Sequence, residues 1–367
     1  MLPAGHPLAA GVTTAAPLVR AYRGDRPGRT PVWFMRQAGR SLPEYRALRR
    51  GVAMFDACLD PAMACEITLQ PVRRYGVDAA VFFSDIMVPL RLAGVPVEIV
   101  PGTGPVVEAP VRTADDVAAL VDHRLTAEPS GPLAPIIEAV RLTVAELRGT
   151  PLVGFAGAPF TLAAYLVEGG PSRDHLAART MMHADPASWA RLMAWCADVT
   201  GMFLQVQLAA GASAGQLFDS WAGSLSRADY VASVAPASAR ALASARLREP
   251  GGTVVPLVHF GVGTGHLLAD MLRAGGDVAG VDYRTPLDEA AQALGPEVPL
   301  QGNIDPAMLA APWPVLEAHV RDVLRRGGAA RSHVVNLGHG VPPATDPDVL
   351  SRIVDLVHET PQPARAS

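Results

Sequence analysis

The sequence predicts an α/β protein that folds as a single (β/α)8 barrel of the TIM type, with its active site at the carboxyl ends of the strands. Short apolar runs alternate with longer amphipathic runs, which is typical of parallel strands joined by helical crossovers. Eight such repeats suit a closed barrel, and an open doubly wound sheet is the alternative. No boundary in the middle of the chain divides it into two domains.

The eight candidate strands are short runs rich in β-branched and aromatic residues. They are 31–35, 79–85, 151–157, 214–220, 254–260, 278–283, 298–304 and 333–339. Helical patterns lie between them, for example 61–76, 133–149, 187–211 and 313–328. The segment 92–116 predicts an additional hairpin, inserted before the third repeat.

Both ends of the chain are expected to be flexible tails around a barrel that spans residues 18–360. Residues 1–17 are rich in Ala, Pro and Gly and lack the basic segment of a signal peptide. Residues 361–367 have the composition of a second tail.

The composition excludes several classes of protein. The chain has 367 residues, of which 49% are hydrophobic, so it can bury a large core. A formal charge of −4 provides no electrostatic attraction for nucleic acid, and no apolar run is expected to reach the ~18 residues of a membrane helix. Three cysteines without a C-x-x-C pair indicate reduced thiols in a cytoplasmic protein. All 31 basic residues are arginine, so no catalytic lysine can form a Schiff base.

The run PVWFMRQAGRSLPEYR, residues 31–46, places two arginines four residues apart between a strand and a helix. Ser41 and Glu44 have the spacing of a capping box, which predicts a helix that begins at about Ser41. Gly39 would allow the chain to turn. Guanidinium groups at Arg36 and Arg40 suit a substrate with several carboxylates or phosphates, and two solvated loop arginines are the alternative.

Further polar residues fall at the ends of the expected strands, where the active site of such a barrel forms. They are Asp85, Ser220, His259, Asp282, Tyr283, Asn303, Asp305 and His339, and Tyr165 lies in the helix after the third strand. Asp85 is a lone carboxylate between apolar runs and could stabilise a cation, but an N-cap or an arginine-paired aspartate would have the same surroundings. Tyr165 could instead be a core residue and Ser220 a helix cap.

Several motifs together resemble the uroporphyrinogen decarboxylase family. They are MRQAGR with PEYR, FFSDIMVPL, GFAGAPFTLAAYLVEGG, QLFDSWAG, VDYRTPLDEA, LQGNIDP and NLGHG, in register over roughly residues 18–360. The resemblance implies cofactor-independent decarboxylation of the four acetates of uroporphyrinogen III to methyls, which yields coproporphyrinogen III in haem biosynthesis. It also implies a homodimer, and no metal or organic cofactor.

The resemblance assigns roles to particular residues. Asp85 would bind the central pyrrole N–H groups and support a cationic intermediate, and Arg36 and Arg40 would hold substrate carboxylates. Arg36 is also the candidate proton donor, although a guanidinium is a poor acid and relay of a proton from water or from the substrate remains open. The other implied substrate contacts are Gln37, Ala38, Gly39, Tyr165, Ser220 and His339. His266 stands where the family usually has an acidic residue and Tyr283 where it usually has Trp.

Two other functions are alternatives to this one. A zinc-dependent methyltransferase of the same fold family, acting on a thiol and a corrinoid, would need thiolate and imidazole ligands at strand ends. Cys58, Cys65 and Cys196 all lie in predicted helices, which disfavours it. A non-enzymatic tetrapyrrole carrier would keep the arginines but would not need Asp85.

Overall fold

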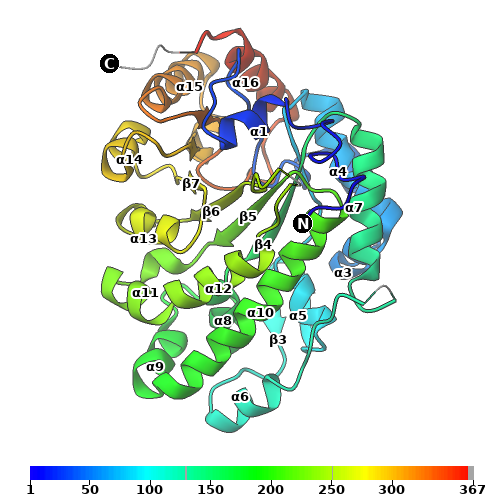
Figure 1. The fold of residues 1–367 in the computed structure, drawn as a ribbon, viewed down its shortest axis with the longest axis vertical. Coiled ribbons are helices and arrows are strands. Elements are labelled where there is room, and N and C mark those ends of the chain that lie inside the picture. Colours follow the sequence, from blue (N-terminus) through cyan, green and yellow to red (C-terminus); the bar gives the residue numbers. More distant parts are fainter. Residues whose placement is uncertain (129, 250, 363–367) are drawn as a thin grey trace.

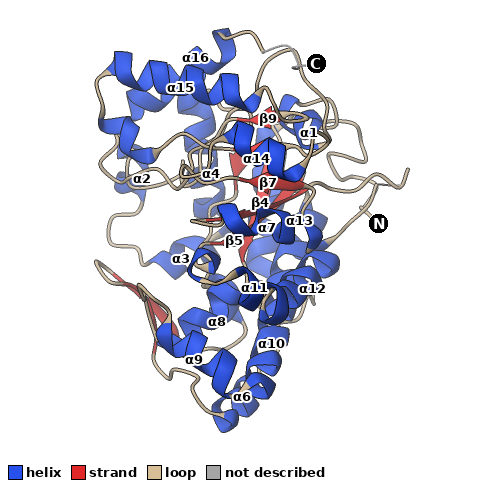
Figure 2. Cartoon of the chain, turned by 90° about the vertical axis from the view of Figure 1, so that its left-hand side faces the viewer, coloured by secondary structure: helices blue, strands red, loops and turns tan. Residues whose placement is uncertain are grey.

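The computed structural model describes residues 1–128, 130–249 and 251–362. At its centre is a curled sheet of seven parallel strands with helices packed around it (Figures 1 and 2). Neighbouring strands follow one another in chain order, so each crossover leads to the adjacent strand. The strands are β1 (Ala80–Val81), β4 (Leu152–Gly157), β5 (Ala214–Asp219), β6 (Leu257–Gly261), β7 (Val278–Gly280), β8 (Leu300–Gln301) and β9 (His333–Val334). All seven lie within predicted strands or overlap them.

The first predicted strand, 31–35, is not a strand in the structure. Val32 makes one isolated parallel bridge to Val335, beside β9. Three N–H groups of the segment donate to side chains instead of to a neighbouring backbone: Val32 to Asp78 Oδ2 (2.8 Å), Phe34 to Gln37 Oε1 (2.9 Å) and Met35 to Asn336 Oδ1 (2.8 Å). The segment is extended and buried as its composition predicts, but side chains supply the bonds that a ladder would make.

The α-helices cover the outside of the sheet. Those before β4 are α1 (Pro17–Tyr22), α2 (Pro43–Leu48), α3 (Met54–Leu59), α4 (Pro61–Tyr75), α5 (Val88–Leu92), α6 (Ala114–Leu120) and α7 (Ala134–Leu147). Those after it are α8 (Pro159–Glu168), α9 (Leu176–Ala184), α10 (Pro186–Ala210), α11 (Arg227–Ser233), α12 (Ala235–Ala245), α13 (Leu268–Arg273), α14 (Leu287–Leu294), α15 (Trp313–Gly327) and α16 (Pro347–Glu359). Short 3-10 turns occur at Ala222–Ser224, Gly265–Leu267 and Pro306–Ala310.

The four longest predicted helical patterns are confirmed as α4, α7, α10 and α15. Helix α4 shows why its two ends could be predicted from residue type. Asp60 accepts a 3.0 Å hydrogen bond from the Met63 N–H at the start of the helix, and Gly76 ends the helix in a left-handed conformation. The predicted additional hairpin is also present, as β2 (Val97–Val100) paired antiparallel with β3 (Gly104–Val107). It stands apart from the main sheet (Figure 2).

The predicted capping box at the start of α2 is wrong. The helix begins at Pro43 with Leu42 as its N-cap residue and no side-chain cap. The Glu44 carboxylate does not reach back toward Ser41, because it makes two hydrogen bonds to Arg74 of α4, at 2.7 and 2.9 Å. A tertiary ion pair has therefore replaced the local motif.

The N-terminal segment packs against the body of the protein, unlike the flexible tail expected there. Leu2 and Leu8 are buried, and a ring nitrogen of His6 lies 2.9 Å from the Leu208 carbonyl oxygen. Thr13 and Ser213 share a 2.8 Å hydrogen bond between their hydroxyls. The segment thus covers the amino-terminal end of the sheet beside β5. Of the expected C-terminal tail, residues 363–367 lie outside the described part of the chain.

Helix α10 is long and apolar enough to cross a membrane by length and composition, contrary to the expectation that no run would be. Its 25 residues include an 18-residue window with a mean hydropathy of 1.2. That window is 72% buried, by α8, α12 and the sheet among others. The helix is apolar because it lies inside the fold.

Candidate active site

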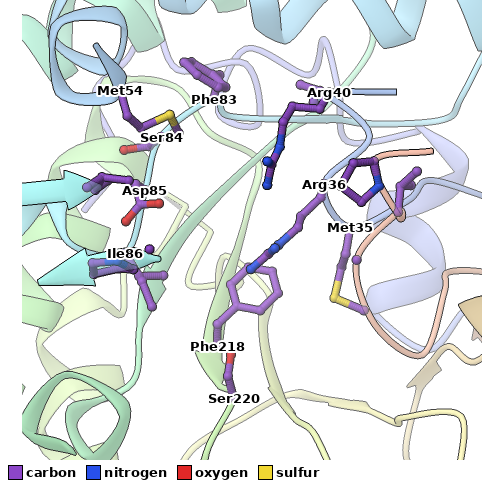
Figure 3. Close-up of a pocket in the computed structure, with 18 of the residues that line it drawn as sticks. Met35, Arg36, Arg40, Met54, Phe83, Ser84, Asp85, Ile86, Phe218 and Ser220 are labelled. Atoms are coloured by element: carbon purple, nitrogen blue, oxygen red, sulfur yellow. The ribbon is translucent and has the colours of Figure 1, made fainter. Parts of the chain in front are cut away.

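A cavity of about 790 Å³ opens at the carboxyl ends of the strands. Eight of the nine predicted site residues line it: Arg36, Ala38, Gly39, Arg40, Asp85, Tyr165, Ser220 and His339. Arg36 and Arg40 extend into the cavity from one side, and the Asp85 carboxylate faces them from the other (Figure 3). The tip of the β2–β3 hairpin forms part of the rim.

In the loop that carries the two arginines, the left-handed residue is Arg36 and not Gly39. Arg36 has a φ of +62°, in the left-handed region that non-glycine residues rarely adopt. Its side chain passes directly over Gly340, where a Cβ would lie only 2.5 Å from Arg36 Cδ. The NLGHG segment therefore needs glycine at position 340 so that Arg36 can reach the cavity.

Gln37 is the predicted contact that does not line the cavity. Its side chain is fully buried and holds the loop: Oε1 accepts from the Phe34 N–H at 2.9 Å and Nε2 donates to the Ala79 carbonyl at 3.0 Å. Gln37 joins the arginine loop to the residues just before β1. It supports the site from behind.

The cavity wall is positively charged. Neither Arg36 nor Arg40 forms an ion pair with any residue in the described part of the chain, so both are available to an anionic ligand. A third arginine, Arg49, also lines the cavity, with its guanidinium 5.7 Å from the centre of the Tyr45 ring. Sequence reasoning missed Arg49 because PEYRALRR holds three arginines with no local feature that distinguishes them.

Asp85 lies half-buried after β1, in the turn before α5. Its Oδ1 accepts a 2.9 Å hydrogen bond from the Met87 N–H. Burial raises the pKa of Asp85 above its ordinary value of 3.8, although the Met87 N–H and the charge of Arg36 act in the opposite direction. With one hydrogen bond from the protein, the carboxylate has capacity for further hydrogen-bond donors.

This raised pKa predicts that Asp85→Asn stabilises the fold at neutral pH. Near pH 7.5 the ionised carboxylate lowers the free energy of unfolding, whereas well below pH 3.8 Asp85 is protonated in both states and that penalty disappears. The Tm of Asp85→Asn should exceed that of the wild type at pH 7.5, and the difference should shrink on acidification, measured by calorimetry.

Asp305→Asn is the matched control, because Asp305 also accepts a 2.9 Å hydrogen bond from the N–H two residues later but does not line the cavity. A Tm for Asp85→Asn below that of the wild type at pH 7.5 would contradict the prediction.

Tyr165 reaches the cavity from α8 and is held by an aromatic stack. Its ring lies 4.0 Å from that of Trp221, centre to centre, at 29°. Burial, followed by the negative charge of Asp85, raises the pKa of Tyr165 to about 12. Its hydroxyl therefore stays protonated at neutral pH and can donate a hydrogen bond to a substrate oxygen.

The floor of the cavity is aromatic. Phe218, which precedes Ser220 by two residues, makes edge-to-face contacts with Phe155 and Phe260 at 5.4 and 5.9 Å between ring centres. These rings come from the neighbouring strands β4, β5 and β6, so the alternation of side chains along each strand brings them together. Such a surface suits a flat or saucer-shaped ligand with polar groups at its edge.

His339 completes the ring of polar groups. Its side chain is exposed in the cavity mouth, and its Nδ1 accepts a 2.7 Å hydrogen bond from the Gly340 N–H. Since Nδ1 is the acceptor, Nε2 carries the hydrogen of the neutral ring and is free to donate. Gly338 allows this turn, because a Cβ there would collide with the Tyr283 backbone nitrogen at 2.2 Å.

Other residues predicted at strand ends lie outside the cavity. His259 points away from it, toward the Met271 carbonyl oxygen, 3.1 Å from Nδ1. The two departures from the family pattern, His266 and Tyr283, do not line the cavity either. No group of three or more His, Cys, Asp or Glu side chains placed to hold a metal ion occurs within residues 1–128, 130–249 and 251–362.

Comparison with known proteins identifies the family. Residues 13–360 match the family model described as uroporphyrinogen decarboxylase. The chain belongs to the uroporphyrinogen decarboxylase family. A uroporphyrinogen decarboxylase of Arthrobacter sp. (strain FB24) is 67% identical over 95% of this chain and 98% of its own length. Another, of Leifsonia xyli subsp. xyli (strain CTCB07), is 65% identical over 96% of this chain and 97% of its own.

Solved structures of proteins with other names share this fold. A methyltransferase from Methanosarcina mazei superposes with a TM-score of 0.74 over 95% of this chain and 98% of its own, at 17% identity. A B12-independent methionine synthase from Shewanella sp. W3-18-1 superposes at 0.54 over 81% of this chain and 87% of its own, at 11% identity. Identities this low establish a shared architecture only.

Proposed function

We propose that this chain decarboxylates the four acetate side chains of uroporphyrinogen III, yielding coproporphyrinogen III in porphyrin and haem biosynthesis. The observation that carries the proposal is Asp85, a half-buried carboxylate that faces, across a large cavity, two arginines without ion-pair partners among the described residues. Membership of the family supplies the substrate class. The excess of three arginines over one carboxylate on the cavity wall matches a substrate with eight carboxylates.

The chemistry needs a cation before it can release CO2. Loss of CO2 from an acetate on an electron-rich pyrrole would leave an unfavourable carbanion. Protonation of the pyrrole at a ring carbon first creates an iminium that accepts the electron pair of the breaking C–C bond. The exocyclic carbon then takes a proton and the ring carbon releases its own, so each turnover consumes one proton and converts one acetate to a methyl.

Asp85 is placed to stabilise that cation while it accepts hydrogen bonds from the pyrrole N–H groups. Two unit charges about 4 Å apart, at an effective dielectric constant of about 20, interact with about 4 kcal/mol. If this energy is available mainly in the transition state, it accelerates the reaction roughly a thousandfold. Because Asp85 is already partly removed from water before the substrate binds, little of this interaction energy is lost to desolvation of the carboxylate.

The remaining residues bind and orient the substrate. Arg36 and Arg40 hold carboxylates, and Arg36 is the candidate that delivers the proton, directly or by relay from water or from the substrate's own carboxyl group. Tyr165, Ser220 and His339 donate hydrogen bonds to other carboxylates, and Ala38 and Gly39 provide the backbone surface between the arginines. No metal or organic cofactor takes part, because the protonated pyrrole is itself the electron acceptor.

Product analysis tests the function directly. Anaerobic incubation with reduced uroporphyrinogen III, followed by oxidation and counting of carboxyl groups, should show loss of CO2 in four steps, from eight carboxylates to four. A parallel sample dialysed against a strong chelator should be equally active. Loss of activity that zinc restores would favour the methyltransferase alternative, and tight binding without CO2 release would favour a carrier.

We also propose that the protein is a cytoplasmic homodimer with a closed (β/α)8 barrel and no nucleic-acid or membrane partner. Three free, buried cysteines support a reducing compartment. The closed barrel is supported by backbone hydrogen bonds on both sides of the segment 31–33, from the Trp33 N–H to the Val335 carbonyl and from the Asp78 N–H to the Val32 carbonyl.

A dimer would supply additional walls to a cavity that must admit a bulky macrocycle. Light scattering at the assay concentration should give twice the monomer mass of 38.4 kDa. A fully active species at the monomer mass would refute the dimer.

A further inference from the structure

A buried polar cluster lies behind the active site, on the face of the sheet opposite the cavity. Phe218 and Ser220 line the cavity, and the side chain of Asp219, between them on β5, points the other way, toward α8. Its carboxylate and the imidazole of His259, on the adjacent strand β6, are both fully buried. Asp219 Oδ2 and His259 Nε2 are 3.7 Å apart.

The partners of His259 determine where its hydrogens are. Nδ1 lies 3.1 Å from the Met271 carbonyl oxygen, which can only accept, so Nδ1 carries a hydrogen. In a neutral ring Nε2 would then be a bare acceptor facing a carboxylate, and two buried acceptors would oppose each other. Neither Nε2 nor Asp219 Oδ2 has another hydrogen-bond partner among the described residues. A proton shared between them resolves this conflict.

The other carboxylate oxygen connects the cluster to a second element of the site. Asp219 Oδ1 accepts a 3.2 Å hydrogen bond from the hydroxyl of Thr161, in the first turn of α8. Tyr165 lies one helical turn further along α8, and Ser220 directly follows Asp219. Asp219 therefore joins the helix that carries Tyr165, the strand that carries Ser220 and the strand that carries His259.

We propose that Asp219 is a positioning residue of the active site. It fixes the positions of Tyr165 and Ser220 relative to each other, through a proton shared with His259 and through the hydrogen bond from Thr161. Asp219 itself touches no substrate. Small misplacements of substrate-positioning groups lower rates steeply, so a loosened Asp219 should reduce turnover without any loss of a substrate contact. The kinetic part of this proposal rests on the decarboxylase function proposed above, whereas the shared proton does not.

Substitutions at Thr161 test the positioning role. Thr161→Val keeps the shape but removes the donor to Asp219, and Thr161→Ser restores it. We expect Thr161→Val to lower kcat on the order of tenfold or more with a much smaller change in KM, and Thr161→Ser to return kcat to within about twofold of the wild type. Thr143→Val is the matched control: Thr143 is fully buried in α7 and donates at 2.7 Å to Ala139, far from this cluster, so its loss should leave kcat unchanged.

Neutron diffraction of deuterated wild-type crystals tests the shared proton independently of activity. We expect deuterium on His259 Nδ1 and a second deuterium between Nε2 and Asp219 Oδ2. Absence of that second deuterium would overturn the pairing of Asp219 with His259. Because this experiment uses the wild type, it decides the pairing even if Thr161→Val does not fold. An active wild type in which Thr161→Val matched Thr143→Val would overturn the positioning role. A wild type without decarboxylase activity would refute the proposed function and leave the neutron result to decide the pairing.

Discussion

Asp85→Asn is expected to lower kcat on the order of a hundredfold or more, with a smaller change in KM. Asparagine is nearly isosteric and retains an oxygen that can accept the 2.9 Å hydrogen bond from the Met87 N–H, so the turn after β1 should persist. The substitution removes only the negative charge. Because the substrate becomes cationic at the pyrrole only along the reaction path, the loss should fall on the transition state and not on binding.

The competing result is equally clear. If kcat were preserved and KM raised, Asp85 would contribute equally to binding of the ground state and of the transition state. It would then serve only to bind the substrate, and the proposal that its charge stabilises the cationic transition state would have to be abandoned. Asp305→Asn again serves as the control, since it removes a carboxylate with the same backbone hydrogen-bond pattern outside the cavity. Its kcat and KM should match those of the wild type.

Arg36→Ala and Arg40→Ala should each reduce kcat/KM roughly a hundredfold while the fold survives. A charged hydrogen-bonded contact to a carboxylate contributes about 3 kcal/mol at the upper end, which corresponds to that factor. Both side chains extend into the cavity, so their truncation leaves no void in the core. Arg→Lys at either position should recover part of the loss, because lysine keeps the charge but not the planar pair of donors.

Arg50→Ala is the control for these variants. Arg50 lies ten residues after Arg40 in the chain but is exposed and does not line the cavity. Steady-state kinetics with uroporphyrinogen, together with circular dichroism to verify folding, would separate the effects. Wild-type kinetics in either cavity variant would argue against the carboxylate clamp.

Local patterns predicted most of the architecture. Seven of the eight expected strands and the four longest expected helices are present, because alternation of apolar runs, capping aspartates and terminal glycines act within a few residues of chain. The order of these elements implied a parallel sheet, and the carboxyl ends of parallel strands meet on one side. The clustering of Asp85, Ser220 and His339 at one cavity was therefore predictable before any contact was known.

The errors share a different cause. The segment 31–35 has the composition of a strand, but three of its N–H groups bond to the side chains of Asp78, Gln37 and Asn336. The capping box failed because Glu44 pairs with Arg74, and Gln37 missed the cavity because its amide serves Phe34 and Ala79. Each of these differences involves a hydrogen bond to a residue far away in the sequence: Val32 to Asp78, Glu44 to Arg74 and Gln37 to Ala79.

By itself, then, the sequence determined the alternation of strands and helices, the family, and the set of polar residues at the strand ends, since each depends on residue type and spacing along the chain. The tertiary structure alone decided which of those residues face the cavity. Arg36 enters because glycine at position 340 leaves room for its stem, Arg49 enters through the orientation of α2, and Asp219 and His259 are turned to the opposite face. The physical reason is that the burial of a side chain and its hydrogen-bond partners depend on residues far apart in the sequence. A local sequence pattern does not show which of these residues lies close to it in the folded chain.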